Sequence, residues 1–344
     1  MPISSDSLNA KAFLLKIPIF VAMKHSWLTD RKQAEKHSNA MASIVLTALI
    51  SVVLSFPVYV FFYRFMPPVF MGSYRIDPYL TFVPVYAVVL YLALKIRPWL
   101  IYSILFGSII LIISGSVGLY GFGDMYSDYK MVIYNLREGL KQTFFKKEGE
   151  EIFANSERLR EAIDFTNPVV RNFSVNIAVK NFDAYSNSTY NRKTVQYFSI
   201  FKEIRTKWRY VFDPTENEFY SKASETIRLL KADDKFKGDC DDYSILMSAC
   251  IKAIGGRVRL VRTRIVTPEK STGHVYPEVM IGNIKELENI NYLIHEVLFE
   301  AENKGNPIYF CKDPDGSIWL NFDYSDFYPG SPYASKLRIA TLEI

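Results

Sequence analysis

The sequence is poor in the residues that most often hold zinc: it has three cysteines and four histidines among 344 residues. Their spacing contains no zinc-ligand pattern. The stretch KDPDGS at 312–317 begins like a calcium loop, but no ligating glutamate follows at the required spacing. The sequence therefore predicts no metal and no cofactor, and we interpret KDPDGS as a turn between two strands.

Motifs for phosphate and nucleic acid are also missing. There is no glycine-rich phosphate-binding loop and no basic–aromatic nucleic-acid motif. The net charge of +5 is modest. Such a balance fits attachment to a membrane better than a nucleic-acid partner, so we expect no nucleic-acid partner.

Charge is nearly absent from three long stretches between residues 41 and 123. About 20 apolar residues in a helix, at about 1.5 Å each, span the hydrocarbon core of a bilayer, so these stretches predict three transmembrane helices. Buried core helices are the alternative, but three consecutive ones would leave too little polar chain to cover them in water. The predicted spans are about 41–63, 78–96 and 98–122, with a tight turn, KIRP, between the last two.

Basic residues indicate the orientation in the bilayer. Residues 1–40 form a basic tail, and its apolar run AFLLKIPIFVAM contains Lys16 and Pro18 and precedes no cleavage pattern. We therefore expect this run to lie at the bilayer surface rather than act as a signal peptide. The tail and the KIRP turn are more basic than the intervening loop, which predicts a cytoplasmic N-terminus. Three crossings then predict a multi-pass cell-membrane protein with a periplasmic or extracellular C-terminal domain, an orientation that a crossing by AFLLKIPIFVAM would invert.

The rest of the chain carries charges throughout and predicts a soluble region. Residues 124–165 repeat apolar residues at helical spacing, which predicts a helical connector. From 166 to 344 we predict one domain in which helices come first and β-rich segments follow, with a helical insertion at 284–305. This order indicates an α+β fold with helices packed on an antiparallel sheet. The β-rich segments are 257–266, 274–282, 307–311 and 317–323.

The stretch FKGDCDDYSILMSACIKAIGG at 236–256 places Cys240 among three aspartates at the start of a predicted helix. Gly238 allows a tight turn into that helix, and Asp239 can cap it. Unpaired N–H groups at a helix start favour a thiolate, but they favour carboxylates as well. The aspartates therefore oppose ionisation of Cys240 only if their carboxylates point toward the sulfur, and Cys240 needs a cationic partner.

Three blocks of the sequence resemble the signature blocks of the transglutaminase-like superfamily, relatives of the papain-type cysteine proteases. The blocks are KGDCDDYSILMSACIKAIGG at 237–256, GHVYPEV at 273–279 and WLNFDYS at 319–325, within a resemblance that covers roughly residues 166–330. In that family a nucleophilic cysteine opens a helix packed on a sheet, and a histidine and an aspartate lie on the following strands. The resemblance implies that Cys240 is the nucleophile, His274 its base and Asp323 the residue that orients the histidine, an order that agrees with general triad chemistry.

An oxyanion hole needs a second donor beside the backbone N–H of Cys240. The family places an aromatic or amide side chain upstream, which makes Trp208 and Tyr210 in KWRYVFD the candidates.

These features predict a membrane-anchored transglutaminase-like cysteine enzyme. It would act on a protein or peptide substrate at peptide or glutamine amides through an acyl-enzyme, with peptidase or amidase activity favoured over cross-linking. The alternative is a catalytically silent transglutaminase-like module for binding or assembly. Small residues in the third apolar stretch favour close helix contacts, so a homo-oligomer or a membrane complex stays open.

The remaining cysteines leave two possibilities. Cys250 lies ten residues after Cys240 on the same predicted helix, about 15 Å away, so these two cannot form a disulfide. A bridge between Cys250 and Cys311 is one alternative, and two buried thiols are the other.

Overall fold

The computed structural model describes residues 40–63, 65–67, 69–71, 74–96, 99–135, 140–147, 152–182, 192–212, 219–268 and 270–344. The predicted basic tail lies outside these residues, apart from Ala40, and so do Arg97 and Pro98 of the predicted KIRP turn. The chain divides into two compact units, with the boundary between Tyr129 and Lys130.

The first unit contains two helices that are long and apolar enough to cross a membrane. They are Ala40–Tyr63 and α2, Asp77–Lys95, with mean hydropathies of 2.4 and 1.5 in their most apolar windows. Only 22% and 17% of those windows are buried within the chain. They therefore differ from the core helices of a water-soluble protein, which are mostly buried. Between them in sequence lie two antiparallel strands of two residues each, β1 (Phe70–Met71) and β2 (Tyr74–Arg75).

The prediction of three transmembrane helices is wrong: in the described residues two helices are long and apolar enough to cross, and the segment predicted at 98–122 is not a third. The helix α3 runs only over Leu100–Ser116, 17 residues, or about 26 Å, which is less than the hydrocarbon thickness of about 30 Å. It ends because the chain turns back on itself. Gly118 has a left-handed φ of 78°, and Gly121 lies so close to the backbone of Gly115 that a Cβ at 121 would clash.

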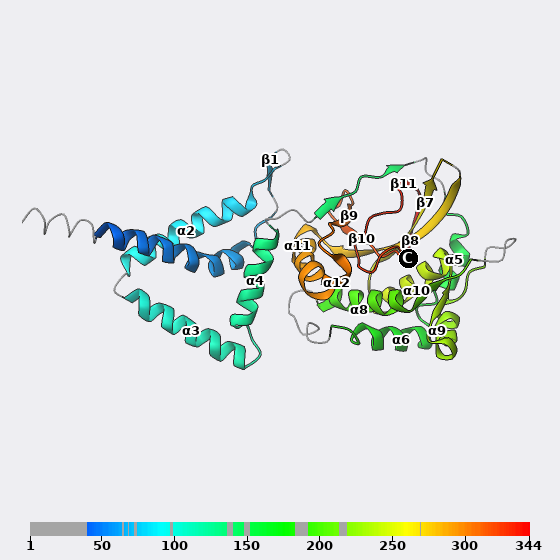
Figure 1. Cartoon of the computed structure of the whole chain (residues 1–344), viewed down its shortest axis with the longest axis horizontal. Helices are drawn as coiled ribbons and strands as arrows, with labels where there is room; N and C mark the ends of the chain where they lie inside the picture. The colour runs from blue at the N-terminus through cyan, green and yellow to red at the C-terminus, as the bar shows by residue number, and fades with distance from the viewer. Residues whose placement is uncertain are drawn as a thin grey trace, which may run out of the picture. The chain divides into compact units, whose positions relative to one another are not determined.

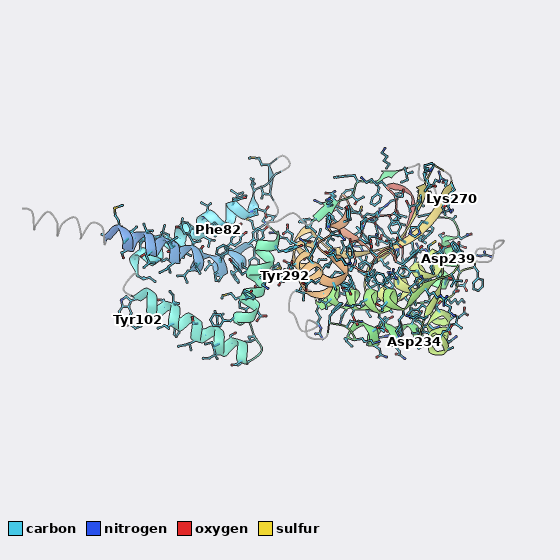
Figure 2. All side chains as sticks on the ribbon, viewed as in Figure 1. Phe82, Tyr102, Asp234, Asp239, Lys270 and Tyr292 are labelled. Carbon is cyan, nitrogen blue, oxygen red and sulfur yellow. The ribbon has the colours of Figure 1, made fainter. Side chains whose placement is uncertain are left out.

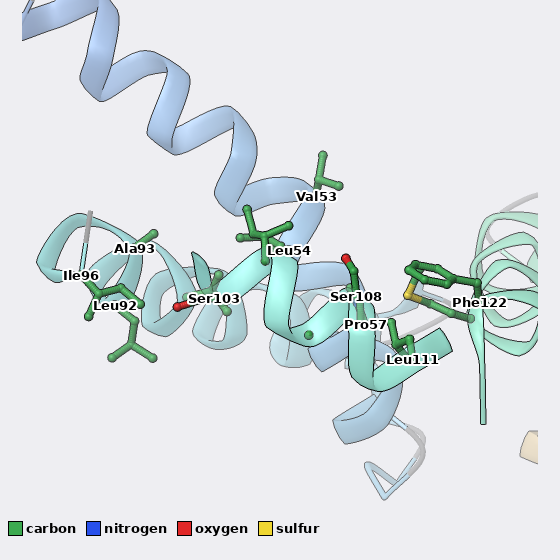
Figure 3. Close-up of a pocket in the computed structure, with 14 residues that line it drawn as sticks. Val53, Leu54, Pro57, Leu92, Ala93, Ile96, Ser103, Ser108, Leu111 and Phe122 are labelled. Carbon is green, nitrogen blue, oxygen red and sulfur yellow. The ribbon is translucent and has the colours of Figure 1, made fainter. Parts of the chain in front are cut away.

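Aromatic rings join the two long helices. Phe56 and Tyr59 of the first helix each lie 5.6 Å, centroid to centroid, from Phe82 of α2. Beside this contact the helices of the first unit leave an apolar cavity of about 570 Å³, and Figure 3 shows side chains such as Leu54, Leu92 and Leu111 in its wall. The first unit is therefore less tightly packed than the interior of a water-soluble domain.

The second unit is built on a seven-stranded sheet in the order β3-β9-β10-β8-β7-β11-β4. The inner pairs are antiparallel, as predicted, whereas both edge pairs, β3 with β9 and β4 with β11, are parallel. The strands are β3 (Leu140–Gln142), β4 (Lys146–Lys147), β7 (Val258–Val266), β8 (Ser271–Gly282), β9 (Ile308–Lys312), β10 (Ile318–Asn321) and β11 (Leu337–Glu343).

Of the predicted helical connector at 124–165, the described residues near its two ends are helical and the described residues 140–147 are not. Helix α4 covers Phe122–Asn135 and α5 covers Ser156–Ala162. Between them, the segment 140–147, which we call the strap, contains β3 and β4 and pairs with both edges of the sheet. The N–H of Thr143 bonds Phe310 O at 2.7 Å, and the N–H of Lys146 bonds Lys336 O at 2.9 Å. Pairing with open sheet edges thus outweighs the helical spacing of its apolar residues.

Helices gather on one side of the sheet in the second unit (Figure 1). α10, which starts at Cys240, packs against β8 and against α6, α8 and α9. As predicted, its apolar side is buried, and Leu246, Met247 and Ile251 have no exposed surface. The helices are α6 (Pro168–Ala178), α8 (Arg192–Lys207), α9 (Ala223–Asp233), α10 (Cys240–Ala253), α11 (Ile284–Leu293), a π-helical turn at Ile294–Leu298, and α12 (Glu300–Asn303).

A short parallel pair, β5 (Trp208–Tyr210) with β6 (Phe236–Gly238), leads into α10. Cys250 and Cys311 are free, buried thiols, so the second of the two alternatives for these cysteines holds.

A charged cluster lies on the face of the sheet that carries the even-numbered residues of β8. Glu278 has no exposed surface, and its two carboxylate oxygens each accept a bond of 2.6 Å, one from Arg259 Nε and one from Arg338 Nη2. Arg259 also bonds Asp313 and stacks on Trp319, with its Cζ 4.1 Å from the ring centroid. Such a buried charge is tolerated only while all its partners are present.

Replacing Glu278 with glutamine should destabilise the second unit by about 3–5 kcal/mol, because two buried guanidinium groups lose their counter-charge. The measurement is urea unfolding of the full chain, followed by tryptophan fluorescence. Glu343→Gln is the matched control, since the Arg257–Glu343 pair is half exposed and should contribute at most about 1 kcal/mol. Equal losses in both variants would contradict this assignment.

Candidate active site

The start of α10 is fixed by a cap and a glycine. Gly238 has a left-handed φ of 156°, and a Cβ there would run into the Asp242 side chain. Asp239 caps the helix, because its Oδ1 accepts bonds from the N–H groups of Asp241 and Asp242 at 2.9 and 3.4 Å. Asp242 is buried and accepts from the N–H of Ser221 at 2.9 Å. Figure 2 labels Asp239 at this helix start.

Cys240 is the first residue of the helix, and its thiol contacts a carboxylate. The sulfur donates to Asp241 Oδ1 at 3.6 Å. Burial raises the pKa of the Cys240 thiol, Asp241 raises that pKa further, and a hydrogen bond from the backbone N–H of Val275 lowers it. Among the three aspartates next to Cys240, Asp241 therefore points toward the sulfur and opposes its ionisation.

His274 and Asp323 form a buried pair across two neighbouring strands. His274 lies on β8 and Asp323 follows β10, and Nε2 of the ring lies 2.9 Å from Asp323 Oδ2. The side chains are only 8% and 2% exposed. The other described histidine, His295, lies in the π-helical turn and has a backbone carbonyl oxygen 2.8 Å from each ring nitrogen.

The carboxylate of Asp323 is held on its second oxygen as well. Oδ1 accepts from the N–H of Tyr324 at 2.8 Å. The N–H of Asp323 bonds Asn321 Oδ1, and the Asn321 amide in turn donates to Ser331 O at 3.2 Å. These bonds fix the orientation of the carboxylate and leave its Oδ2 aimed at the imidazole.

The structure brings the start of α10 to β8 at Val275, the residue after His274. Within the described residues, no hydrogen bond joins the sulfur to the His274 ring. Ser244, which the sequence did not single out, ties the two elements together: it is fully buried, and its Oγ lies 2.7 Å from Cys240 O and 3.1 Å from Val275 O. Its position one helical turn after Cys240 is the only sequence signal that points to it.

Tyr210 and Trp208 lie in different surroundings. Tyr210 pairs in register with Gly238, and burial first, then the neighbouring Cys240 sulfur, raise its pKa to about 12. The Trp208 ring packs edge-on to Tyr243 at 5.1 Å, and its buried Nε1 has no hydrogen-bond partner among the described residues. Tyr210 is therefore the candidate oxyanion donor that lies nearer to the sulfur.

Tyr324 is a further residue of the site that the sequence did not identify. Its ring lies 5.7 Å from the His274 ring and 5.5 Å from the Tyr210 ring. Burial, the Asp323 charge and the nearby Cys240 sulfur raise its pKa. Tyr324 follows Asp323 directly, so its place in the block WLNFDYS was the available signal.

Ligand atoms of Asp239, Cys240 and Asp241 lie within 4.8 Å of one another, a spacing that suits a metal ion. The cap already accounts for the Asp239 carboxylate, and the helix dipole alone favours acidic groups at a helix start. We therefore interpret this cluster as a helix cap.

Part of the second unit matches a known protein family. Residues 182–296 match the family described as "Transglutaminase-like superfamily". The matched residues are similar to that superfamily and contain Cys240 and His274, while Asp323 lies beyond them. None of the curated proteins matches the chain.

The solved structures that are similar include a "Putative Cysteine Protease from Cytophaga hutchinsonii". It is 16% identical, and the match covers 56% of this chain and 44% of that chain, with a TM-score of 0.28. At that score the likeness carries no argument about individual residues.

Replacing Asp241 with asparagine should shift the pH dependence of the alkylation rate of Cys240 to lower pH. The substitution removes a negative charge beside the sulfur and so lowers the pKa of the thiol. We expect alkylation by iodoacetamide at neutral pH to become about 3- to 10-fold faster, which corresponds to about 0.7–1.4 kcal/mol. Mass spectrometry of the Cys240 peptide gives the rate.

Asp242→Asn serves as the control, because that carboxylate bonds the N–H of Ser221 instead of the thiol. An unchanged rate in Asp241→Asn, or an equal rise in both variants, would contradict the proximity of the Asp241 charge.

Proposed function

We propose that the chain is a membrane-anchored cysteine enzyme that cleaves peptide or glutamine amides through an acyl-enzyme. The observation that carries this proposal is the buried His274–Asp323 hydrogen bond, which lies beside the helix start of Cys240 in a transglutaminase-like domain. A histidine held on one nitrogen by a carboxylate has its other nitrogen available as a base.

In the proposed reaction, Nδ1 of His274 takes the proton of the Cys240 thiol while Nε2 stays bonded to Asp323. The sulfur attacks the amide carbonyl carbon, and a C–S bond forms. The negative charge on the carbonyl oxygen is stabilised by the backbone N–H of Cys240, which no intrahelical bond uses, and by the hydroxyl of Tyr210. The C–N bond then breaks, and His274 returns the proton to the leaving amine.

The acyl-enzyme passes next to an acceptor. Water, deprotonated by His274, attacks the thioester carbonyl, the C–S bond breaks, and a carboxylic acid and the Cys240 thiol are released. A lysine amine would instead give a cross-link. Hydrolysis is favoured because the sequence marks no dedicated channel for an amine.

One observation favours a second candidate, a catalytically silent module that binds a peptide or partner protein. The Cys240 thiol donates to Asp241, and burial together with that carboxylate raises its pKa. A thiol in this state is a poor nucleophile unless a protonated His274 offsets the charge. The small residues of α3 would in that case serve assembly of a homo-oligomer or a membrane complex.

The two candidates predict different labelling by an electrophilic peptide amide analogue. An enzyme should be labelled at Cys240, and His274→Ala should slow labelling by about 10²- to 10⁴-fold, the usual contribution of a general base. Cys311→Ala is the control, because that thiol lies in the sheet away from α10. Labelling that survives Cys240→Ala, or that does not depend on His274, would favour the silent module.

For membrane attachment, we propose that Ala40–Tyr63 and α2 cross the bilayer. Their large apolar side chains are mostly exposed, among them Leu49, Val53 and Val83 at 60% or more. The periplasmic or extracellular location expected from the sequence depends on three crossings. Two crossings with the same bias of basic residues place residues 130–344 on the cytoplasmic side instead.

Protease added to intact cells tests this topology. With two crossings, the second unit should stay intact until the cells are permeabilised. Digestion in intact cells would contradict two crossings and restore the outward location that three crossings give.

A further inference from the structure

The strap connects opposite edges of the sheet. Its first strand, β3, pairs with β9 at one edge, and three residues later β4 pairs with β11 at the other. The segment 143–145 therefore passes from one edge strand of the sheet to the other. Thr143 is buried, whereas the neighbouring Phe144 is 74% exposed. The side chains of the strap thus alternate between the sheet and the outside.

Phe145 makes two contacts on the sheet. Its ring lies 4.9 Å from the ring of Tyr333 in an edge-to-face arrangement, and the guanidinium Cζ of Arg338 lies 3.9 Å from its centroid. Both geometries are favourable for aromatic rings.

Both contacts lead to β8, the strand that carries His274. Tyr333 lies 5.7 Å, ring to ring, from Tyr276, and Arg338 bonds Glu278. Tyr276 is almost fully buried, and its ring stacks at 6.0 Å on the ring of His274, two residues before it on the same face of β8. A continuous row of rings thus runs from Phe145 through Tyr333 and Tyr276 to His274.

Two further groups contact the imidazole of His274. Tyr324 lies edge-on to His274 at 5.7 Å, and Asp323 holds Nε2. A ring enclosed in this way cannot rotate unless a neighbour moves, because protein interiors are close-packed. A shift of the Tyr276 ring would therefore allow the His274 ring to shift as well.

We propose that Phe145 is a positioning residue that acts through Tyr333 and Tyr276 to hold the imidazole of His274 in line between Asp323 and Cys240. The effect on catalysis rests on the function proposed above, whereas the effect on the His274 ring does not.

The test uses the full chain in detergent with labelled histidine. The chain has four histidines, and His274→Ala assigns the His274 ring signal. Phe145→Leu removes the ring but keeps apolar bulk. It should shift the His274 ring resonance and slow Cys240 labelling about tenfold at the pH optimum, since misplacing a catalytic group by a fraction of an ångström costs about this much.

Two variants serve as controls. Phe144→Leu changes the exposed neighbour on the same strap and should leave both readouts at the wild-type value. Phe145→Tyr restores a ring and should also restore both. Phe145→Met is a second variant without a ring, used if Phe145→Leu does not fold, as judged by its melting temperature.

The outcomes separate this inference from the proposed function. A His274 resonance in Phe145→Leu or Phe145→Met that matches Phe144→Leu overturns the inference. Labelling of wild-type Cys240 that does not depend on His274 overturns the proposed function, and the resonance then still decides whether Phe145 positions the ring. A shifted resonance with slowed labelling, restored by Phe145→Tyr, supports both.

Discussion

The second unit depends on one constraint: an imidazole and a carboxylate are buried together, and each must keep its partners. His274 and Asp323 are joined across β8 and β10, and the bond survives burial because Asn321 and Tyr324 satisfy the rest of Asp323. The same face of the sheet holds Glu278 between two arginines. Polar groups fully matched in this way fix the register of the strands, and the register fixes the site.

Two requirements conflict at the start of α10, the helix that begins at Cys240. A carboxylate at Asp239 stabilises the cap, whereas the next carboxylate, Asp241, contacts the sulfur and raises the pKa of the Cys240 thiol. The N–H of Val275 acts in the opposite sense. Burial and the Asp241 carboxylate therefore raise the pKa of the Cys240 thiol although the sulfur lies at a helix start.

Local signals predicted the α+β order, the helix that starts at Cys240, and the turn at Gly238, because caps, glycine and apolar spacing act over a few residues. These local signals did not predict contacts between segments that lie far apart along the chain. The strap is spaced like a helix, yet it pairs with β9 and β11, far along the chain. α3 ends early because Gly121 approaches Gly115. The sequence predicted that an aspartate opposes ionisation of Cys240 only if its carboxylate points toward the sulfur. The direction of the Asp241 carboxylate is known only from the structure.

The central claim is that Cys240 ionises as a pair with His274. Ultraviolet absorbance of the thiolate measures this directly when the chain is titrated and the spectrum of Cys240→Ala is subtracted, since Cys250 and Cys311 are common to both. We predict that the thiolate appears at a lower pH in the wild-type chain than in His274→Ala, because a protonated His274 would stabilise the negative charge on the sulfur. A thiolate signal that appears only at high pH and is identical in the two chains would contradict it.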